Sequence, residues 1–260
     1  LICIPTTSGS GSEATWATII TDKTGRTKLE LASKELVPDI VILDPQFPKF
    51  MSPRQTADTG MDALVHSMEA YVNQWRNDFS NAMAIEAIKI IFEYLVRAYN
   101  NPDDLEAREK MHIAATMSGL AFGNSQAGIA HSMGHALGAI FKIPHGRTVG
   151  MLLPYVIKYN MKETIEPYAK IAKSIGIHTN TNEKYVEMLI QAVKDLMKKV
   201  DMPLSIKDMG LDWKTFASEL DELIKRAMVS SESITNPRVP DEEEFRRLFT
   251  YAFNCTEVDF

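Results

Sequence analysis

The spacing of apolar residues changes once along this chain, at Ser52-Pro53, and that change limits the folds that the chain can adopt. Before it, short runs rich in β-branched and aromatic residues alternate with turns, a pattern typical of strands. After it, apolar residues recur every three to four positions, as in amphipathic helices, and a serine before a proline is a common helix start. The sequence therefore predicts a mainly α protein, in which a β-rich segment (1–51) precedes an all-helical domain (52–260).

These two patterns also locate the expected elements. Strands are expected at Leu1–Thr7, Thr15–Thr21 and Asp39–Leu43, with a hairpin turn at Asp22–Gly25. One or two helices should run from Ser52 to about Val72. Further helices are expected at Ser80–Tyr99, Asp104–Phe122, Gly128–Phe141, and about 147–160, 164–174, 182–199, 212–228 and 241–253.

The composition is that of an ordinary globular protein. Apolar residues make up 45% and charged residues 24%, the formal net charge is −6, and the basic residues are dispersed. This distribution argues against a nucleic acid or an anionic membrane surface as partner. No apolar run is long enough to predict a membrane span or a signal peptide, and the cysteines are limited to Cys3 and Cys255. We therefore expect a protein of the reduced cytoplasm.

Two short motifs and the tripeptide PHG contain four of the six histidines. The sequence GMDALVH places Asp62 and His66 one helical turn apart, and GIAHSMGHALG does the same for His131 and His135. His145 follows shortly after, in PHG. Imidazoles that converge with a carboxylate are the ligands that first-row divalent metals prefer, so the motifs predict a metalloenzyme.

Spacing alone leaves the choice of ligands open. His131 and His135 share a helix face and could bind a metal together. In the other arrangement His131 and His145 bind it, and His135 faces the reaction from one turn away. Core histidines on a glycine-rich packing helix are the alternative to any metal site. The sequence His-Glu-x-x-His does not occur, which argues against a zinc protease.

Several motifs, taken in order, resemble those of the iron-containing (group III) alcohol dehydrogenase family. They are IPTTSGSGSE, DIVILDP, TGMDALVHSMEAY and GIAHSMGHALG…PHG, and the resemblance extends to NPR at Asn236–Arg238. It implies a Rossmann-like dinucleotide domain followed by a helical metal-binding domain, so that residues 1–51 would be the C-terminal part of the former. It also implies hydride transfer between a primary or small secondary alcohol and NAD or NADP, with Fe(II), Zn(II) or another divalent metal.

The resemblance further implies roles for individual residues. The metal ligands would be Asp62, His66, His131 and His145. His135 would be a catalytic residue beside the metal and the nicotinamide. The cofactor would be contacted by residues of the small-residue loop TTSGSGSE and by one lysine, namely Thr6, Thr7, Ser10 and Lys28. Viewed by itself, that loop could bind an anion through its amides or form an exposed turn.

The family's Gly-Gly-Gly-Ser phosphate loop does not occur in this sequence. We therefore expect an upstream segment to be missing, and NAD(P) to bind weakly to these residues alone. We also expect a small-molecule alcohol or aldehyde substrate and a homo-oligomer. Alternative functions are those of related enzymes, glycerol-1-phosphate dehydrogenase and the lyase dehydroquinate synthase, or that of a non-catalytic metal-binding fragment.

Overall fold

The helical region begins where the apolar spacing changes. In the computed structural model, which describes residues 1–22 and 27–260, Ser52 is the N-cap of helix α1 (Pro53–Val72). Its hydroxyl accepts a hydrogen bond from the Gln55 amide at 3.1 Å. Pro53 takes the first helical position, where a missing N–H costs nothing because the first amides of a helix have no partner within it.

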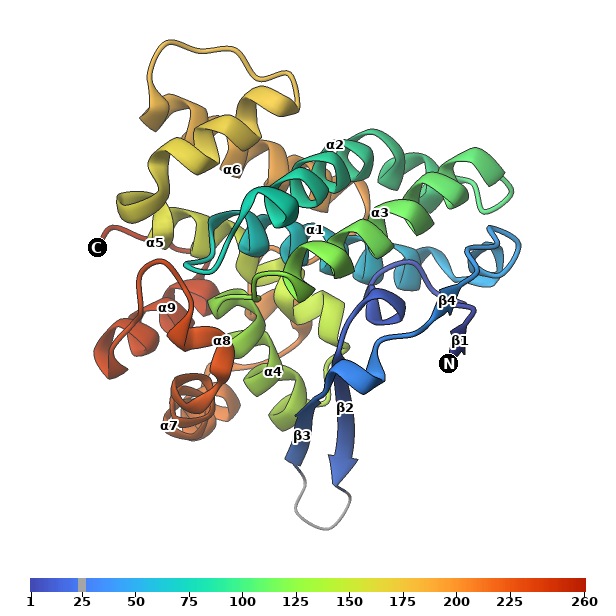
Figure 1. Cartoon of the computed structure of the whole chain (residues 1–260). Helices are drawn as coiled ribbons and strands as arrows, with labels where there is room; N and C mark the ends of the chain where they lie inside the picture. The colour runs from blue at the N-terminus through green and yellow to red at the C-terminus, as the bar shows by residue number, and fades with distance from the viewer. Residues whose placement is uncertain (23–26) are drawn as a thin grey trace.

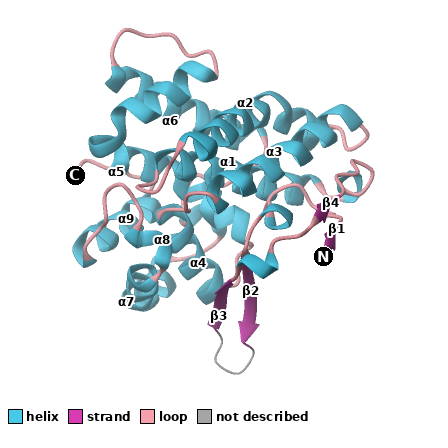
Figure 2. Cartoon of the chain, viewed as in Figure 1, coloured by secondary structure: helices cyan, strands magenta, loops and turns pink. Residues whose placement is uncertain are grey.

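Helices make up most of the described chain (Figures 1 and 2), which confirms the expected fold class. They follow α1 as α2 (Asp78–Asn100), α3 (Leu105–Gly123), α4 (Ile129–Phe141), α5 (His145–Ser174), α6 (Asn182–Lys199), α7 (Trp213–Val229), α8 (Ser231–Ile234) and α9 (Glu242–Asn254). Two expected helices form the single element α5, which is interrupted by non-helical dihedral angles at Thr164. Among the described residues, no helix has the length and hydropathy that a membrane span requires.

Helix α1 lies inside the helical region and packs against α2, α3 and α5. Of its 20 residues, 15 are buried, so it has almost no face in contact with water. The buried residues of α1 include polar side chains, among them Asp62, His66 and Glu69. Buried polar groups are costly unless they find hydrogen-bond or ionic partners. Neighbouring elements must therefore supply partners for the ionisable side chains of α1.

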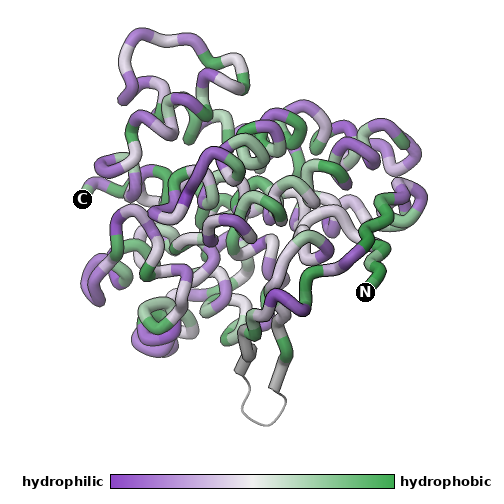
Figure 3. Tube along the Cα trace, viewed as in Figure 1, coloured by the Kyte–Doolittle hydropathy of each residue, from purple (hydrophilic) through white to green (hydrophobic). Residues whose placement is uncertain are grey.

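The strands form two separate pairs. Strand β1 (Ile2–Cys3) lies parallel to β4 (Ile40–Val41), and β2 (Ala17–Asp22) lies antiparallel to β3 (Thr27–Ala32). Strands β1, β2 and β4 lie within or close to the expected strands, whereas β3 lies where no strand was expected. The hairpin turn expected at Asp22–Gly25 falls, beyond its first residue, outside the described residues. Parallel strands are usually buried on both faces. Here the β1–β4 pair exposes apolar side chains, and Figure 3 shows this hydrophobic segment near the N-terminus.

The loop between β1 and β2 is packed onto the helices and is not an exposed turn. Gly11 has a φ of 60° and lies against Gly119 of α3, where an added Cβ would be 2.3 Å from the Gly11 carbonyl oxygen. Both positions therefore require glycine. The buried Ser8 hydroxyl lies 2.8 Å from Nδ1 of His112, also on α3. Through these contacts the loop connects the first fifty residues to the helical region by packing against α3.

Candidate metal centre

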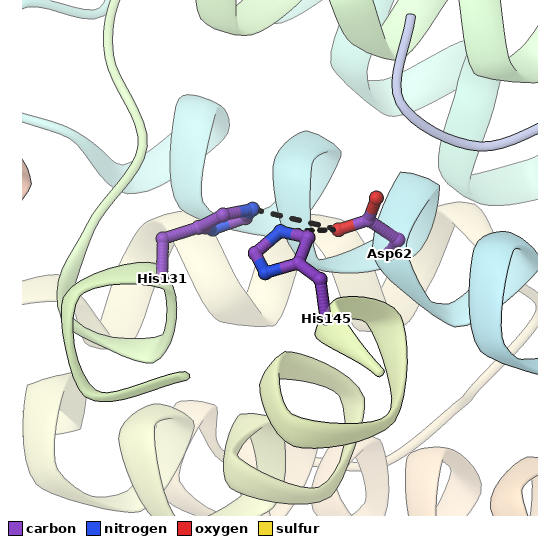
Figure 4. Close-up of side chains that lie close together, drawn as sticks. All are labelled: Asp62, His131 and His145. Carbon is purple, nitrogen blue, oxygen red and sulfur yellow. Dashed lines mark ion pairs between the residues drawn. The ribbon is translucent and has the colours of Figure 1, made fainter. Parts of the chain in front are cut away.

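Three elements bring ionisable side chains to one point (Figure 4). Asp62 lies in α1, His131 in the first turn of α4, and His145 at the first residue of α5. Their ligand atoms all lie within 4.8 Å of one another. Oδ1 of Asp62 is 3.6 Å from Nε2 of His131 and 3.3 Å from Nε2 of His145. The structure thus brings together three of the side chains that the motifs singled out.

The turn between α4 and α5 explains why His145 reaches this point. Lys142 adopts the left-handed conformation, with a φ of 56°, and ends α4. Pro144 is the N-cap of α5, and its restricted backbone favours a helix start immediately afterwards. The chain reverses direction within these few residues, so the ring of His145 comes to lie 5.4 Å from that of His131, centroid to centroid.

His66 also lies at the cluster. Its Nδ1 is 3.8 Å from Oδ1 of Asp62, one helical turn away on α1. Its ring stacks on that of His131, with centroids 4.2 Å apart, and on that of Phe122 at 4.3 Å. It is therefore a third imidazole neighbour of the Asp62 carboxylate, although it is not part of the most compact group of three.

The unpaired polar atoms at this point fit a bound cation. Among the described residues, buried atoms that lack a hydrogen-bond partner include Oδ1 of Asp62, Nδ1 of His66 and Nε2 of His131. Each such atom costs about 1–3 kcal/mol when left unpaired, so their convergence requires an explanation. One carboxylate with several imidazoles is a donor set that suits Fe(II), Zn(II), Mn(II) or Co(II).

Burial and mutual charge displace the pKa values of these groups. Burial raises the pKa of Asp62, but the neighbouring His66, His145 and His131 outweigh it and hold that pKa well below its usual value. Burial lowers the pKa of His66 to about 3. Burial also acts to lower the pKa of His131, yet the carboxylates of Glu69 and Asp62 raise it to about 10. The two carboxylates therefore favour a positive charge at this point.

His135 lies beside the cluster and faces a second carboxylate. Its ring stacks on His145, with centroids 4.8 Å apart, and its Nδ1 is 3.3 Å from Oε2 of Glu232 on α8. The Ser230 hydroxyl donates a hydrogen bond to the same oxygen at 2.6 Å. Burial raises the pKa of Glu232, but His135 and the other neighbours lower it to about 2. The pair is therefore an anionic carboxylate against an imidazole.

A cavity of about 830 Å³ opens over these side chains. Both regions of the molecule line it, because Ser10, Ser12 and residues of β2 and β3 line it together with the histidines. Ser10 thus lies at the cavity, whereas Thr6 and Thr7 are not among its lining residues. Lys28 lies on β3, and its side chain is outside the described part of the structure.

Two carboxylates near the cluster, Glu69 and Glu232, were not singled out in the sequence. Glu69 follows Asp62 by seven residues, which is two helical turns, so helical spacing could have placed it on the same face. Glu232 lies on a helix of four residues, too short to show any periodicity. No sequence signal pointed to it.

Comparison with known proteins identifies the family. The model of the Fe-containing alcohol dehydrogenase family's C-terminal part matches residues 56–253, and that of iron-containing alcohol dehydrogenases matches residues 1–45. The chain is 42% identical over 259 residues to an NADPH-dependent butanol dehydrogenase of Clostridium saccharobutylicum, covering 100% of this chain and 66% of that relative. It is 37% identical over 252 residues to a 1-propanol dehydrogenase of Citrobacter freundii, and the match covers 95% of this chain and 68% of that relative.

Solved structures agree with this result. An alcohol dehydrogenase from Oenococcus oeni has a TM-score of 0.93 at 34% identity, covering 97% of this chain and 66% of its own. A 1,3-propanediol oxidoreductase has a TM-score of 0.92 at 31% identity, and the match covers 97% of this chain and 65% of the oxidoreductase. The chain thus spans about two thirds of the length of these relatives. These matches confirm the resemblance of the motifs, and the chain belongs to the iron-containing alcohol dehydrogenase family.

Proposed function

We propose that this chain forms the metal-binding part of an alcohol dehydrogenase that transfers a hydride between a small alcohol and NAD or NADP. The observation that carries the proposal is the convergence of the buried Asp62 and His131 with the half-buried His145 at one cavity. A cavity of about 830 Å³ is of the size that holds small ligands and parts of cofactors. The names of two relatives, a butanol and a 1-propanol dehydrogenase, support a primary aliphatic alcohol as substrate.

The proposed ligands are Asp62, His66, His131 and His145, and the proposed metal is Fe(II). A divalent metal bound there would act as a Lewis acid toward the alcohol oxygen and make its hydroxyl proton easier to remove. Asp62 supplies the negative charge that the three neutral imidazoles lack. The burial of Asp62 and His131 excludes water from that side of the site, which strengthens the electrostatic interactions there.

His135 is the proposed proton acceptor for the alcohol. It lies on the same cavity as the proposed ligands and contacts His145. Glu232, against its Nδ1, supports a positive charge on the ring after the proton has been accepted. Ser10, on the cavity wall formed by the first fifty residues, is the loop residue that we propose contacts the dinucleotide.

Deuterium transfer tests this function. The chain is joined to the portion of the butanol dehydrogenase relative that it does not cover, loaded with Fe(II), and given NADP with 1-butanol deuterated at C1. We expect deuterium on C4 of the reduced nicotinamide, and no transfer in the Asp62→Asn form. Tight metal binding without any reduced nicotinamide would instead favour a non-catalytic metal-binding protein.

A further inference from the structure

The glutamate Glu69 of α1 contacts the proposed metal ligand His131 on the side away from Asp62. Both side chains are 2% exposed. Oε2 of Glu69 lies 2.5 Å from Nδ1 of His131, the ring nitrogen that is not directed at the cluster. A hydrogen bond between an imidazole N–H and a carboxylate is charge-assisted, and such bonds are stronger than those between neutral groups.

The same carboxylate also caps the N-terminus of α4. The amide of Gly128 donates to its Oε2 at 2.9 Å, and the amide of Ala130 donates to its Oε1 at 2.6 Å. The N-cap residue of α4 is Gly128, which has no side chain to satisfy these amides. An added Cβ at Gly128 would lie 2.9 Å from Oε1 of Glu69, so glycine allows the carboxylate to approach. Glu69 therefore caps a helix from another helix.

These contacts determine how the ring of His131 is held. An ionised carboxylate accepts hydrogen bonds and donates none, so Nδ1 of His131 carries the hydrogen that points to Glu69. Nε2 is then the nitrogen left for a metal. It faces Oδ1 of Asp62 at 3.6 Å and, within the described residues, has no hydrogen-bond partner.

We propose that Glu69 is a positioning residue of the metal centre, which fixes the tautomer and orientation of His131 while it caps the helix that carries this ligand. The inference rests on the proposed function, because it takes His131 to be a metal ligand. Outer carboxylates of this kind typically contribute about 10–100-fold to metal affinity. In Glu69→Gln one oxygen becomes an NH₂ group, so a donor must face either Nδ1–H or a helix amide, and at least one hydrogen bond is lost.

Cobalt binding tests this role. Metal-free chain is titrated with Co(II), and the visible absorption of the bound ion gives Kd for the unaltered chain, for Glu69→Gln and for Ser132→Ala. Ser132 is a matched control, because it is buried in the same turn of α4 and bonds to Ile129 and Ser233 but to neither Glu69 nor the cluster. We expect both variants to lower Tm, but only Glu69→Gln to weaken Co(II) binding, by about 10–100-fold.

The outcomes separate the two proposals. If the unaltered chain does not bind Co(II), the metal centre itself is wrong, and the role of Glu69 with it. If the unaltered chain binds Co(II) and Glu69→Gln binds it equally well, only the role of Glu69 is wrong. Equal weakening by Glu69→Gln and Ser132→Ala would also overturn it, because the effect would then be loss of structure alone.

A second measurement needs no variant. In the unaltered chain loaded with Zn(II), ¹⁵N chemical shifts of the imidazole of His131 distinguish its two ring nitrogens. We expect a protonated Nδ1 and a metal-bound Nε2. A metal-bound Nδ1 would overturn the proposal even if the Glu69→Gln protein failed to fold.

Discussion

The first fifty residues and the helical region bury their apolar side chains to very different extents. In the helical region a continuous core surrounds α1. Half of the exposed large apolar side chains among the described residues belong instead to the first fifty, with Ile2, Ile40 and Phe50 at 61%, 52% and 85% exposure. The helical region therefore covers most of its own apolar surface, whereas the strands contribute apolar surface that their own neighbours do not cover.

The same division applies to the site. Every proposed metal ligand comes from α1, α4 or α5, whereas the first loop and the β2–β3 hairpin supply other parts of the cavity wall. Metal binding should therefore depend on the helical region alone, and cofactor binding on both regions.

The largest effect is expected for the ligands themselves. Asp62→Asn or His131→Ala should reduce metal affinity by more than the roughly 10–100-fold that a supporting residue contributes, because a site short of one ligand loses both charge and geometry. Elemental analysis of the purified protein measures it. His178→Ala, which changes an exposed histidine, is the control and should retain metal. Stoichiometric metal in the His131→Ala protein would contradict the assignment.

His135→Ala should separate turnover from metal binding. Loss of a group that accepts a proton in the reaction lowers the rate by about 10²–10⁴-fold. The metal should remain, because the proposed ligands are unchanged. Metal content and kcat, measured on the same preparation of the fusion described above, test both statements. If this variant loses its metal, His135 belongs among the ligands.

Cofactor binding should depend on more than this chain. A glycine-rich phosphate loop supplies several backbone N–H donors, each contributing about 1 kcal/mol, and the sequence contains no such loop. Residues 1–260 alone should therefore bind NADP roughly 10²–10³-fold more weakly than the fusion, while both bind metal equally. Calorimetric titration of both proteins decides the point, and equal tight NADP binding would refute it.

The smallest effect is expected at the junction of the two regions. Alanine at Gly119 would place a Cβ 2.3 Å from the carbonyl oxygen of Gly11, so the loop must shift, at a cost of about 1–3 kcal/mol. Hydrogen exchange should become faster in the loop and stay unchanged in α1. Gly123→Ala is a matched control on the same helix, because its Cβ would meet no atom closer than 3.7 Å. Unchanged exchange in Gly119→Ala would show that the loop does not depend on this packing.

The sequence predicted the helices well because their spacing and their ends are local signals. Ser52 and Pro53 mark the start of α1 within the sequence itself. Helix α8 has four residues and no period, so it was missed. Strands β1, β2 and β4 were expected to be longer than they are, and β3 was not expected, because strand pairing depends on partners that a local pattern does not specify.

The candidate site was predictable in part for the same reason. Helical spacing predicted that Asp62 and His66 would be neighbours, and the structure has them so. Spacing could not choose between His135 and His145, because that depends on the chain reversal at Lys142. It also could not find the partner of Glu69, since Glu69 and His131 are 62 positions apart and meet only through the packing of α1 against α4.

The central claim is that Asp62, His66, His131 and His145 hold one divalent metal. Anomalous diffraction from crystals of the Co(II)-loaded chain, recorded on both sides of the cobalt absorption edge, tests it most directly. The account predicts one strong anomalous peak bordered by Oδ1 of Asp62, Nε2 of His131 and the rings of His66 and His145. A loaded crystal without a peak at this point, or with its main peak at other side chains, would contradict it.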